Sequence, residues 1–207
     1  MLFGYVRALA MQLQSLNNTK GKQKQELISK LYSQQMIQVF RLIGQLVGAG
    51  DEELSALAYP FAELLNAYQK VSESVEYLPL KLHLVQIELQ LMDKTGLYLP
   101  QVLDSLVKLL NSSPLQKKQA KKAGVEGSIE LGYRLSLNEL KNTQILNDIF
   151  DKSLFYLHWL ATISYRMLGA VEIVRHICKM LTTLELGFSG HKKAVKQFCR
   201  LLQEDAN

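Results

Sequence analysis

Four histidines are the side chains of this sequence best suited to proton transfer or metal binding: His83, His158, His176 and His191. Each falls on a different predicted helix, and none belongs to the HExxH spacing that sets two imidazoles on one helix face around zinc. A Cys-x-x-Cys pair and a glycine-rich phosphate loop are also missing from the sequence. We therefore predict a protein that is not an enzyme and has no metal, nucleotide, other cofactor or small-molecule substrate.

The two cysteines and one acidic cluster have ordinary structural explanations. Cys178 and Cys199 lie on apolar faces of predicted helices, where free cysteine behaves as a small buried hydrophobe. We expect them to be reduced, as in an intracellular compartment, rather than joined in a disulfide. Asp51, Glu52 and Glu53 stand at the predicted start of a helix, where capping and the helix dipole favour acidic side chains.

Two groups of basic side chains are candidates for binding the phosphates of nucleic acid. The first lies in a polar stretch, and the second forms one stripe of the last predicted helix: Lys117, Lys118, Lys121, Lys122, and Lys192, Lys193, Lys196, Arg200. Each phosphate contact would steepen the salt dependence of binding. No aromatic side chain interleaves with the first group, so no stacking platform for sequence readout is expected. A solvated loop and a solvated helix face remain the bland alternatives.

The elements that must position these groups are organised around two apolar runs between residues 77 and 110. Each run opens with a proline, Pro79 or Pro100, and Gly96 separates them. The first run alternates leucines as a strand would, yet it is long and poor in β-branched residues, which favours a helix. Proline suits the first turn of a helix and glycine its left-handed end. With Pro60, the pattern predicts three helices that start about 20 residues apart.

This spacing is half the period of about 40 residues that is typical of two-helix repeats. We predict an all-α fold, a short HEAT/armadillo-like helical-repeat stack that forms one domain over residues 1–207. Apolar periodicity predicts further helices at 2–16 and 25–47, and three more after residue 142.

One insertion interrupts the predicted stack. We expect a basic, exposed loop at 112–127, because its lysines have few apolar neighbours in the sequence. Residues 128–137 alternate with a period of two and predict an extended segment. Its unpaired backbone must lie along helices or pair with another chain. The side chains expected to point inward are Ile129, Leu131, Tyr133 and Leu135.

The charge distribution suggests surfaces with different partners. The formal charge is +5 over residues 1–50, −5 over 51–110 and +5 over 111–207, although solvated helix faces alone could produce this layout. No apolar run reaches the roughly 18 residues of a membrane span, so we expect no membrane partner. The N-terminal residues lack the basic and apolar regions of a signal peptide.

Several short motifs follow one another in a recognisable order: Ala58-Tyr59-Pro60, Tyr77-Leu78-Pro79-Leu80-Lys81-Leu82-His83, Thr95-Gly96-Leu97-Tyr98-Leu99-Pro100 and Arg134-Leu135-Ser136. In order and spacing they resemble the YP, YxPLRxH, TGxxxP and KLS signatures of the nucleolar complex protein 2 family, which are eukaryotic ribosome-assembly factors. The sequence departs from the family pattern at Gly169, Ala170, Val171 and Glu172, where the family has Phe-Pro-Glu.

The resemblance implies a non-enzymatic helical scaffold of ribosome biogenesis in the nucleus and nucleolus. It implies a heterodimer with a larger helical-repeat protein of the nucleolar complex protein 1 or 3 type. It also implies association with the pre-60S particle, the precursor of the large ribosomal subunit, with direct rRNA contact left open. A cytosolic α-solenoid adaptor that binds only proteins is the alternative.

A partner interface is expected on two predicted helices. The N-terminal helix carries apolar residues around its whole axis, which is typical of a helix covered on more than one side. The Pro79 helix is also apolar on most of its circumference, so it is either the innermost helix or partly in an interface. The expected contact residues are Leu2, Phe3, Tyr5, Val6, Leu9, Pro79, Lys81 and His83.

Overall fold

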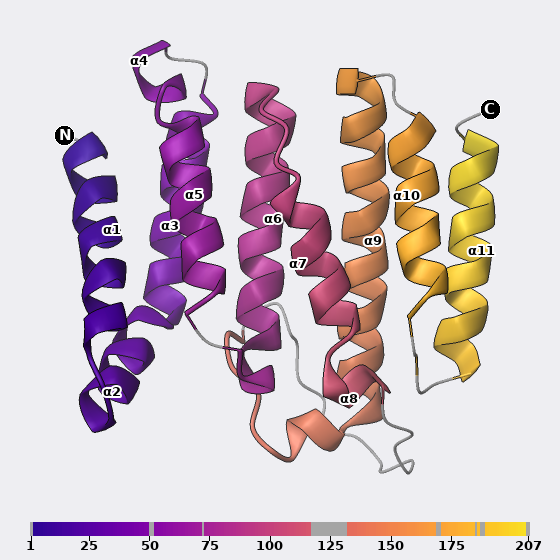
Figure 1. Cartoon of the computed structure of the whole chain (residues 1–207), viewed down its shortest axis with the longest axis horizontal. Coiled ribbons are helices and arrows are strands. Elements are labelled where there is room, and N and C mark those ends of the chain that lie inside the picture. Colours follow the sequence, from indigo (N-terminus) through magenta and orange to yellow (C-terminus); the bar gives the residue numbers. More distant parts are fainter. Residues whose placement is uncertain are drawn as a thin grey trace.

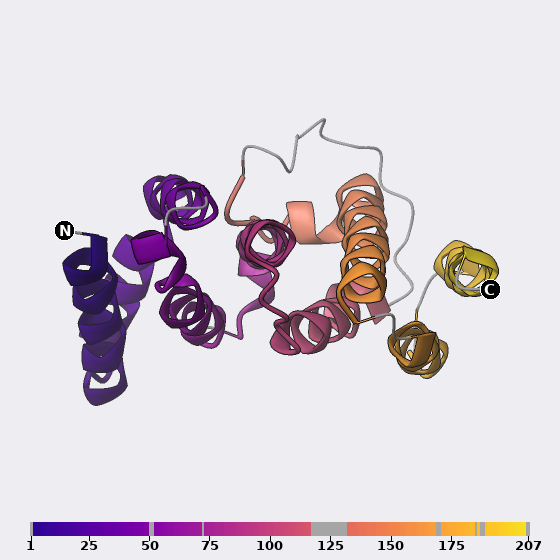
Figure 2. The same cartoon turned by 90° about the horizontal axis from the view of Figure 1, so that it is seen from above.

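The computed structural model describes residues 2–49, 52–71, 73–116, 132–168, 171–184, 186 and 189–205. These residues form eleven α-helices and two 3-10 turns, and they contain no β-strand. The helices stand side by side from α1 at one end to α11 at the other (Figure 1), and the view from above shows them staggered (Figure 2). The predicted all-α stack is confirmed, whereas its HEAT/armadillo-like character and its single domain stay predictions.

Helix α6 (Leu78–Thr95) is the centre of the stack, as Figure 1 shows. It packs against α3 (Gln34–Val47), α5 (Ala58–Gln69), α7 (Gln101–Leu110) and α9 (Thr143–Leu168). Twelve of its eighteen residues are buried, which explains why apolar residues surround its axis. Of the two alternatives for this segment, the innermost helix is therefore the one observed.

Proline and glycine set the ends of α6 as predicted. Pro79 lies in its first turn, and Gly96 follows its last residue with φ 70°, the left-handed conformation that only glycine adopts without strain. A second glycine, Gly44 of α3, allows a close approach, because a Cβ there would lie 3.2 Å from Cγ2 of Ile87. The same rules hold for α7, which begins directly after Pro100.

The N-terminal region differs from the prediction at one point. Helix α1 (Leu2–Asn18) is confirmed, but the single helix expected at 25–47 is wrong, because α2 (Lys22–Leu31) and α3 are separate. Tyr32 is buried between them, and the Ser33 side chain caps α3 by accepting a 3.3 Å hydrogen bond from the Met36 amide. Helix α4 (Glu52–Ser55) is short, and α5 restarts with Pro60 in its first turn.

The first residues of the predicted basic loop are helical instead. Residues 113–116 form the short helix α8 (Ser113–Gln116), in which Pro114 and Leu115 are buried. Leu115 is fully covered, so this part of the segment does have an apolar anchor, contrary to the prediction. Residues 117–127, with Lys117, Lys118, Lys121 and Lys122, lie outside the described residues.

The described part of the predicted extended segment, residues 132–137, lies against the start of α6. The 3-10 turn η1 (Val75–Tyr77) supplies its partners: the Leu135 amide donates a 2.7 Å hydrogen bond to the Glu76 carbonyl. Leu135 is buried and Tyr133 is partly buried, whereas Arg134 between them is exposed. The inward alternation is confirmed for these residues, while 128–131 lie outside the described part.

The C-terminal part contains η2 (Glu139–Lys141), α9, α10 (Val171–Thr182) and α11 (Ser189–Asp205). Asn142 caps α9 by accepting a 2.9 Å hydrogen bond from the Gln144 amide. Helices α10 and α11 pack on α9 and on each other. Across the described residues, no helix is both long and apolar enough to cross a bilayer.

Candidate interaction surfaces

The histidines occupy packing and surface positions. His83 of α6 is buried: its Nδ1 accepts from the Arg41 guanidinium and its Nε2–H donates to the Gly132 carbonyl, both at 3.0 Å. His191 stacks on the Phe150 ring with centroids 3.8 Å apart and contacts Asn147 Oδ1 at 2.9 Å. His158 and His176 are exposed on separate helices. The described residues contain no group of three potential metal ligands.

The cysteines join α10 to α11. Cys178 and Cys199 are both free and buried, and each thiol faces the main-chain carbonyl of the other residue, at 3.7 and 4.0 Å. Burial raises the pKa of Cys199 to about 12, and the neighbouring Cys178 adds to this rise. The pair therefore acts in the described structure as part of the helix contact.

The N-terminal end of the molecule exposes apolar side chains. Val6 and Leu9 of α1 are buried against the core and Leu2 is half-buried. Phe3 is 58% exposed and Tyr5 is 47% exposed, and Met11, at 61%, belongs to the same helix. Single exposed apolar residues are common, but three on an end helix indicate a surface that a partner could cover.

A groove lies between α1 and α5. We call it the α1–α5 groove; it has a volume of about 530 Å³ and is lined by Ala10, Leu13, Gln14, Pro60, Glu63, Leu64, Ala67, Lys70 and Val71. Six of these nine lining residues are apolar, so the groove suits the apolar face of a partner helix. None of its lining residues was among the contact residues expected from the sequence.

The other expected interface residues lie at the centre of the stack. Pro79 and His83 are covered by the chain itself, so their side chains are not available to a partner. Lys81 lines a separate cleft between α5, α6 and α7 and is partly covered. Burial lowers the pKa of Lys81, although nearby Glu73 opposes this effect.

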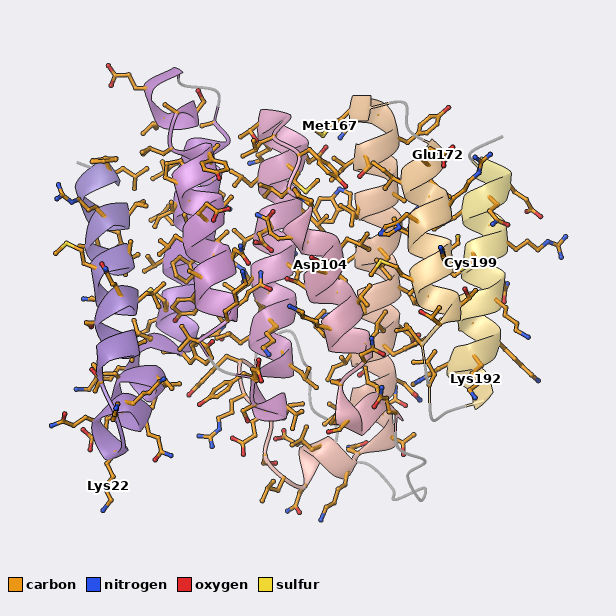
Figure 3. All side chains as sticks on the ribbon, viewed as in Figure 1. Lys22, Asp104, Met167, Glu172, Lys192 and Cys199 are labelled. Carbon is orange, nitrogen blue, oxygen red and sulfur yellow. The ribbon has the colours of Figure 1, made fainter. Side chains whose placement is uncertain are left out.

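The C-terminal end is mainly basic, although Leu201 of α11 is also 51% exposed. Lys192, Lys193, Lys196 and Arg200 are all exposed along α11. Figure 3 shows Lys192 at one end of α11 and Cys199 farther along it, on the side of the molecule away from Lys22.

A groove of about 500 Å³ runs between α10 and α11, and we call it the α10–α11 groove. Its lining residues are Arg175, Cys178, Lys179, Thr182, Lys196, Cys199, Arg200 and Gln203. The sequence did not single out Arg175 and Lys179, although their spacing of four residues on one helix was a signal that could have found them.

Comparisons with known proteins agree on one family. The sequence profile of the Noc2p family matches residues 1–207. Nucleolar complex protein 2 of Drosophila melanogaster is 24% identical over 209 residues, covering 99% of this chain and 27% of its own length. The nucleolar complex protein 2 homolog of Caenorhabditis elegans is 24% identical over 217 residues, covering 97% and 30%. Nucleolar complex-associated protein 2 of Arabidopsis thaliana is 30% identical over 139 residues, covering 66% and 17%. The chain thus spans less than a third of each of these relatives.

Proposed function

This chain belongs to the Noc2p family, and we propose that it is a non-catalytic scaffold in nucleolar ribosome biogenesis. The observation that carries the proposal is the match of the whole chain to the family, whose relatives are named nucleolar complex proteins in animals and a plant. The name of these relatives places this chain in the nucleolus, and thus in the nucleus. This favours the assembly role over a cytosolic adaptor.

The finer part of the proposal is pairing on precursors of the large ribosomal subunit. We propose that the chain forms a one-to-one heterodimer with a larger helical-repeat protein of the nucleolar complex protein 1 or 3 type. A stack of helices has two open ends, and an end must carry a polar face or be covered. The α11 end exposes four basic side chains, whereas the α1 end exposes Phe3, Tyr5 and Met11 and also contributes to the largely apolar α1–α5 groove.

The α1 end is therefore the surface that we assign to the partner. A helix of the partner would lay its apolar side in the α1–α5 groove, in contact with Ala10 and Ala67. Phe3 and Tyr5 would extend the contact along α1, as expected from the sequence. Permanent complexes commonly bury more than about 2,000 Å² in largely apolar contacts, so the groove supplies the centre of the interface rather than all of it.

The experiment that tests this function is purification of the tagged chain from cells, with sequencing of the RNA and identification of the proteins that come with it. We expect precursors of large-subunit rRNA, and a helical-repeat nucleolar complex protein in equal amount. Recovery of small-subunit precursors alone, or of cytosolic proteins without ribosomal RNA, would contradict the proposal.

A further inference from the structure

The α10–α11 groove brings together basic side chains from two helices that are separate in the sequence. Arg175 and Lys179 come from α10, and Lys196 and Arg200 come from α11. No carboxylate is among the eight lining residues, so the groove has four positive charges and no negative one. This differs from the cleft beside Lys81, where Glu73 and Asp104 line the same space as three lysines.

The two carboxylates nearest in sequence do not neutralise the groove. Glu172 pairs with Arg175 at 2.6 Å and Glu204 pairs with Arg200 at 2.8 Å. The side chains in these pairs are 55% to 81% exposed, so the pairs are weak and exchange readily for another anion. Lys179 and Lys196 make no salt bridge within the described residues, and both are exposed.

The spacing of the charges forms two parallel rows. Within each helix the basic residues are four apart, which corresponds to a rise of about 6 Å along one face. The two rows face each other across a floor that contains Cys178 and Cys199. The result is a shallow, open groove with cations on both sides, which favours a linear polyanion over a single small anion.

The chemistry of the lining decides what kind of polyanion fits. Apart from the two buried cysteines, the lining side chains are arginine, lysine, threonine and glutamine. Protein interfaces depend on apolar and aromatic anchors in their centre, and this groove offers none. A nucleic-acid backbone requires only cations and hydrogen-bond donors, so it suits this surface better than an acidic protein segment does.

We propose that the α10–α11 groove binds the phosphate backbone of RNA, without sequence preference, through Arg175, Lys179, Lys196 and Arg200. The choice of RNA as the polyanion rests on the proposed function, whereas the polyanion site rests on the groove itself. Lys192 and Lys193 extend the same side of α11 beyond the groove and add long-range attraction. The absence of aromatic lining residues is the reason for expecting no base readout.

The test measures binding of the 207-residue chain to a fluorescein-labelled oligouridine and to a labelled RNA duplex of mixed sequence. Four phosphate contacts predict that affinity for the single strand falls about fifty-fold between about 50 and 200 mM salt. The variant Lys179→Gln with Lys196→Gln keeps two contacts and should fall only about sevenfold over the same range. Its helical circular dichroism should equal that of the wild type, because both lysines are exposed.

A matched control removes the same charge elsewhere. Lys22 and Lys30 are exposed on α2, at the other end of the molecule, and Lys22→Gln with Lys30→Gln should keep the wild-type salt slope. A photocrosslinking residue at Thr182, in the groove, should attach to the RNA, and one at Gln12 of α1 should not.

Three results would overturn the proposal. The wild-type chain could bind neither RNA, the groove variant could keep the full salt slope, or polyglutamate of equal charge could compete as well as RNA. If the wild-type chain binds neither RNA but still purifies with its partner and with ribosomal precursors, the groove proposal is wrong and the proposed function stands. If the chain binds RNA through the groove but never purifies with ribosomal precursors, the groove proposal stands and the proposed function is wrong.

Discussion

The hydroxyl of Tyr32 donates a 2.7 Å hydrogen bond to the main-chain carbonyl of Tyr68, and the Tyr68 hydroxyl returns a bond to the Leu31 carbonyl. This reciprocal pair joins the break between α2 and α3 to the end of α5. The two rings also contact each other, with centroids 5.0 Å apart, and both are almost completely buried. The direction of the chain after α2 is therefore set by a contact with a residue 36 positions away.

Replacing Tyr32 with Phe should weaken this junction without opening a cavity. One buried hydrogen bond is lost while the ring stays in place, so the free energy of unfolding should fall by about 1 kcal/mol. For a domain of this size that corresponds to a melting temperature lower by about 2 to 4 °C. Tyr59→Phe is the control, since Tyr59 is 61% exposed and its change should leave the melting temperature unaltered. Equal effects of the two substitutions would contradict this role.

Helix ends that depend on local residues could be predicted from the sequence, whereas the break at Tyr32 could not. Pro79 and Gly96 act through their own backbone, and the helix ends they predict are present. The α2–α3 break depends on Tyr68, which no local pattern connects with Tyr32.

The same distinction between local and long-range features applies to the candidate surfaces. The basic stripe of α11 was visible as a helical repeat, because its residues lie on one element. The walls of both grooves come from two helices each. The spacing of Arg175 and Lys179 was visible in the sequence, but their position beside the α11 stripe, like that of Ala10 beside Ala67, could be found only after the helices were placed side by side.

Glu88 of α6 places a carboxyl group in the protein core. It is fully buried, its Oε2 accepts a 2.7 Å hydrogen bond from the Gln69 amide, and its Oε1 has no partner. Burial raises its pKa to about 8, and the nearby Glu63 carboxylate adds to the rise, against the effect of Gln69. At neutral pH the folded chain therefore keeps this carboxyl protonated.

The variant Glu88→Gln should become more stable than the wild type as pH rises. The unfolded carboxyl loses its proton above its ordinary pKa of 4.5, whereas the folded one keeps it up to about pH 8. The folded wild type binds the extra proton in this window, so its stability decreases through it. The advantage of the glutamine should grow by on the order of 1 kcal/mol per pH unit and level off above about pH 8. Urea unfolding across this range measures it.

A control separates this effect from general charge removal. Glu26 of α2 is exposed, and Glu26→Gln should change stability little and equally at all pH values. A difference between Glu88→Gln and wild type that stays constant from about pH 5 to 8 would refute the assignment of a buried protonated carboxyl.

The thiols of Cys178 and Cys199 should react slowly with an aromatic disulfide reagent in the folded chain. Both are buried, and burial raises the pKa of Cys199 to about 12, so little thiolate is present at neutral pH. In denaturant, both thiols should react rapidly with the reagent. Thr182→Cys provides an exposed thiol on the same groove and should react at the rate of an unfolded peptide. Fast reaction of the two native thiols would show that α10 and α11 separate readily.

The α1–α5 groove offers a substitution that leaves the core intact. Ala10 and Ala67 line the groove and are exposed, so Ala10→Glu with Ala67→Glu adds two carboxylates without disturbing buried side chains. Alanine and glutamate both favour helices, so the fold should be retained. The matched control is Ala49→Glu with Ala56→Glu, two exposed alanines that lie outside both α1 and the groove lining.

Light scattering on the chain co-expressed with a nucleolar complex protein of the 1 or 3 type tests the paired scaffold most directly. We predict a one-to-one species for the wild type and for the Ala49, Ala56 control. The Ala10, Ala67 variant should separate from the partner or bind it at least tenfold more weakly. A wild-type chain that stays monomeric, folds cooperatively alone and shows no affinity for either type of partner at micromolar concentration would contradict the account.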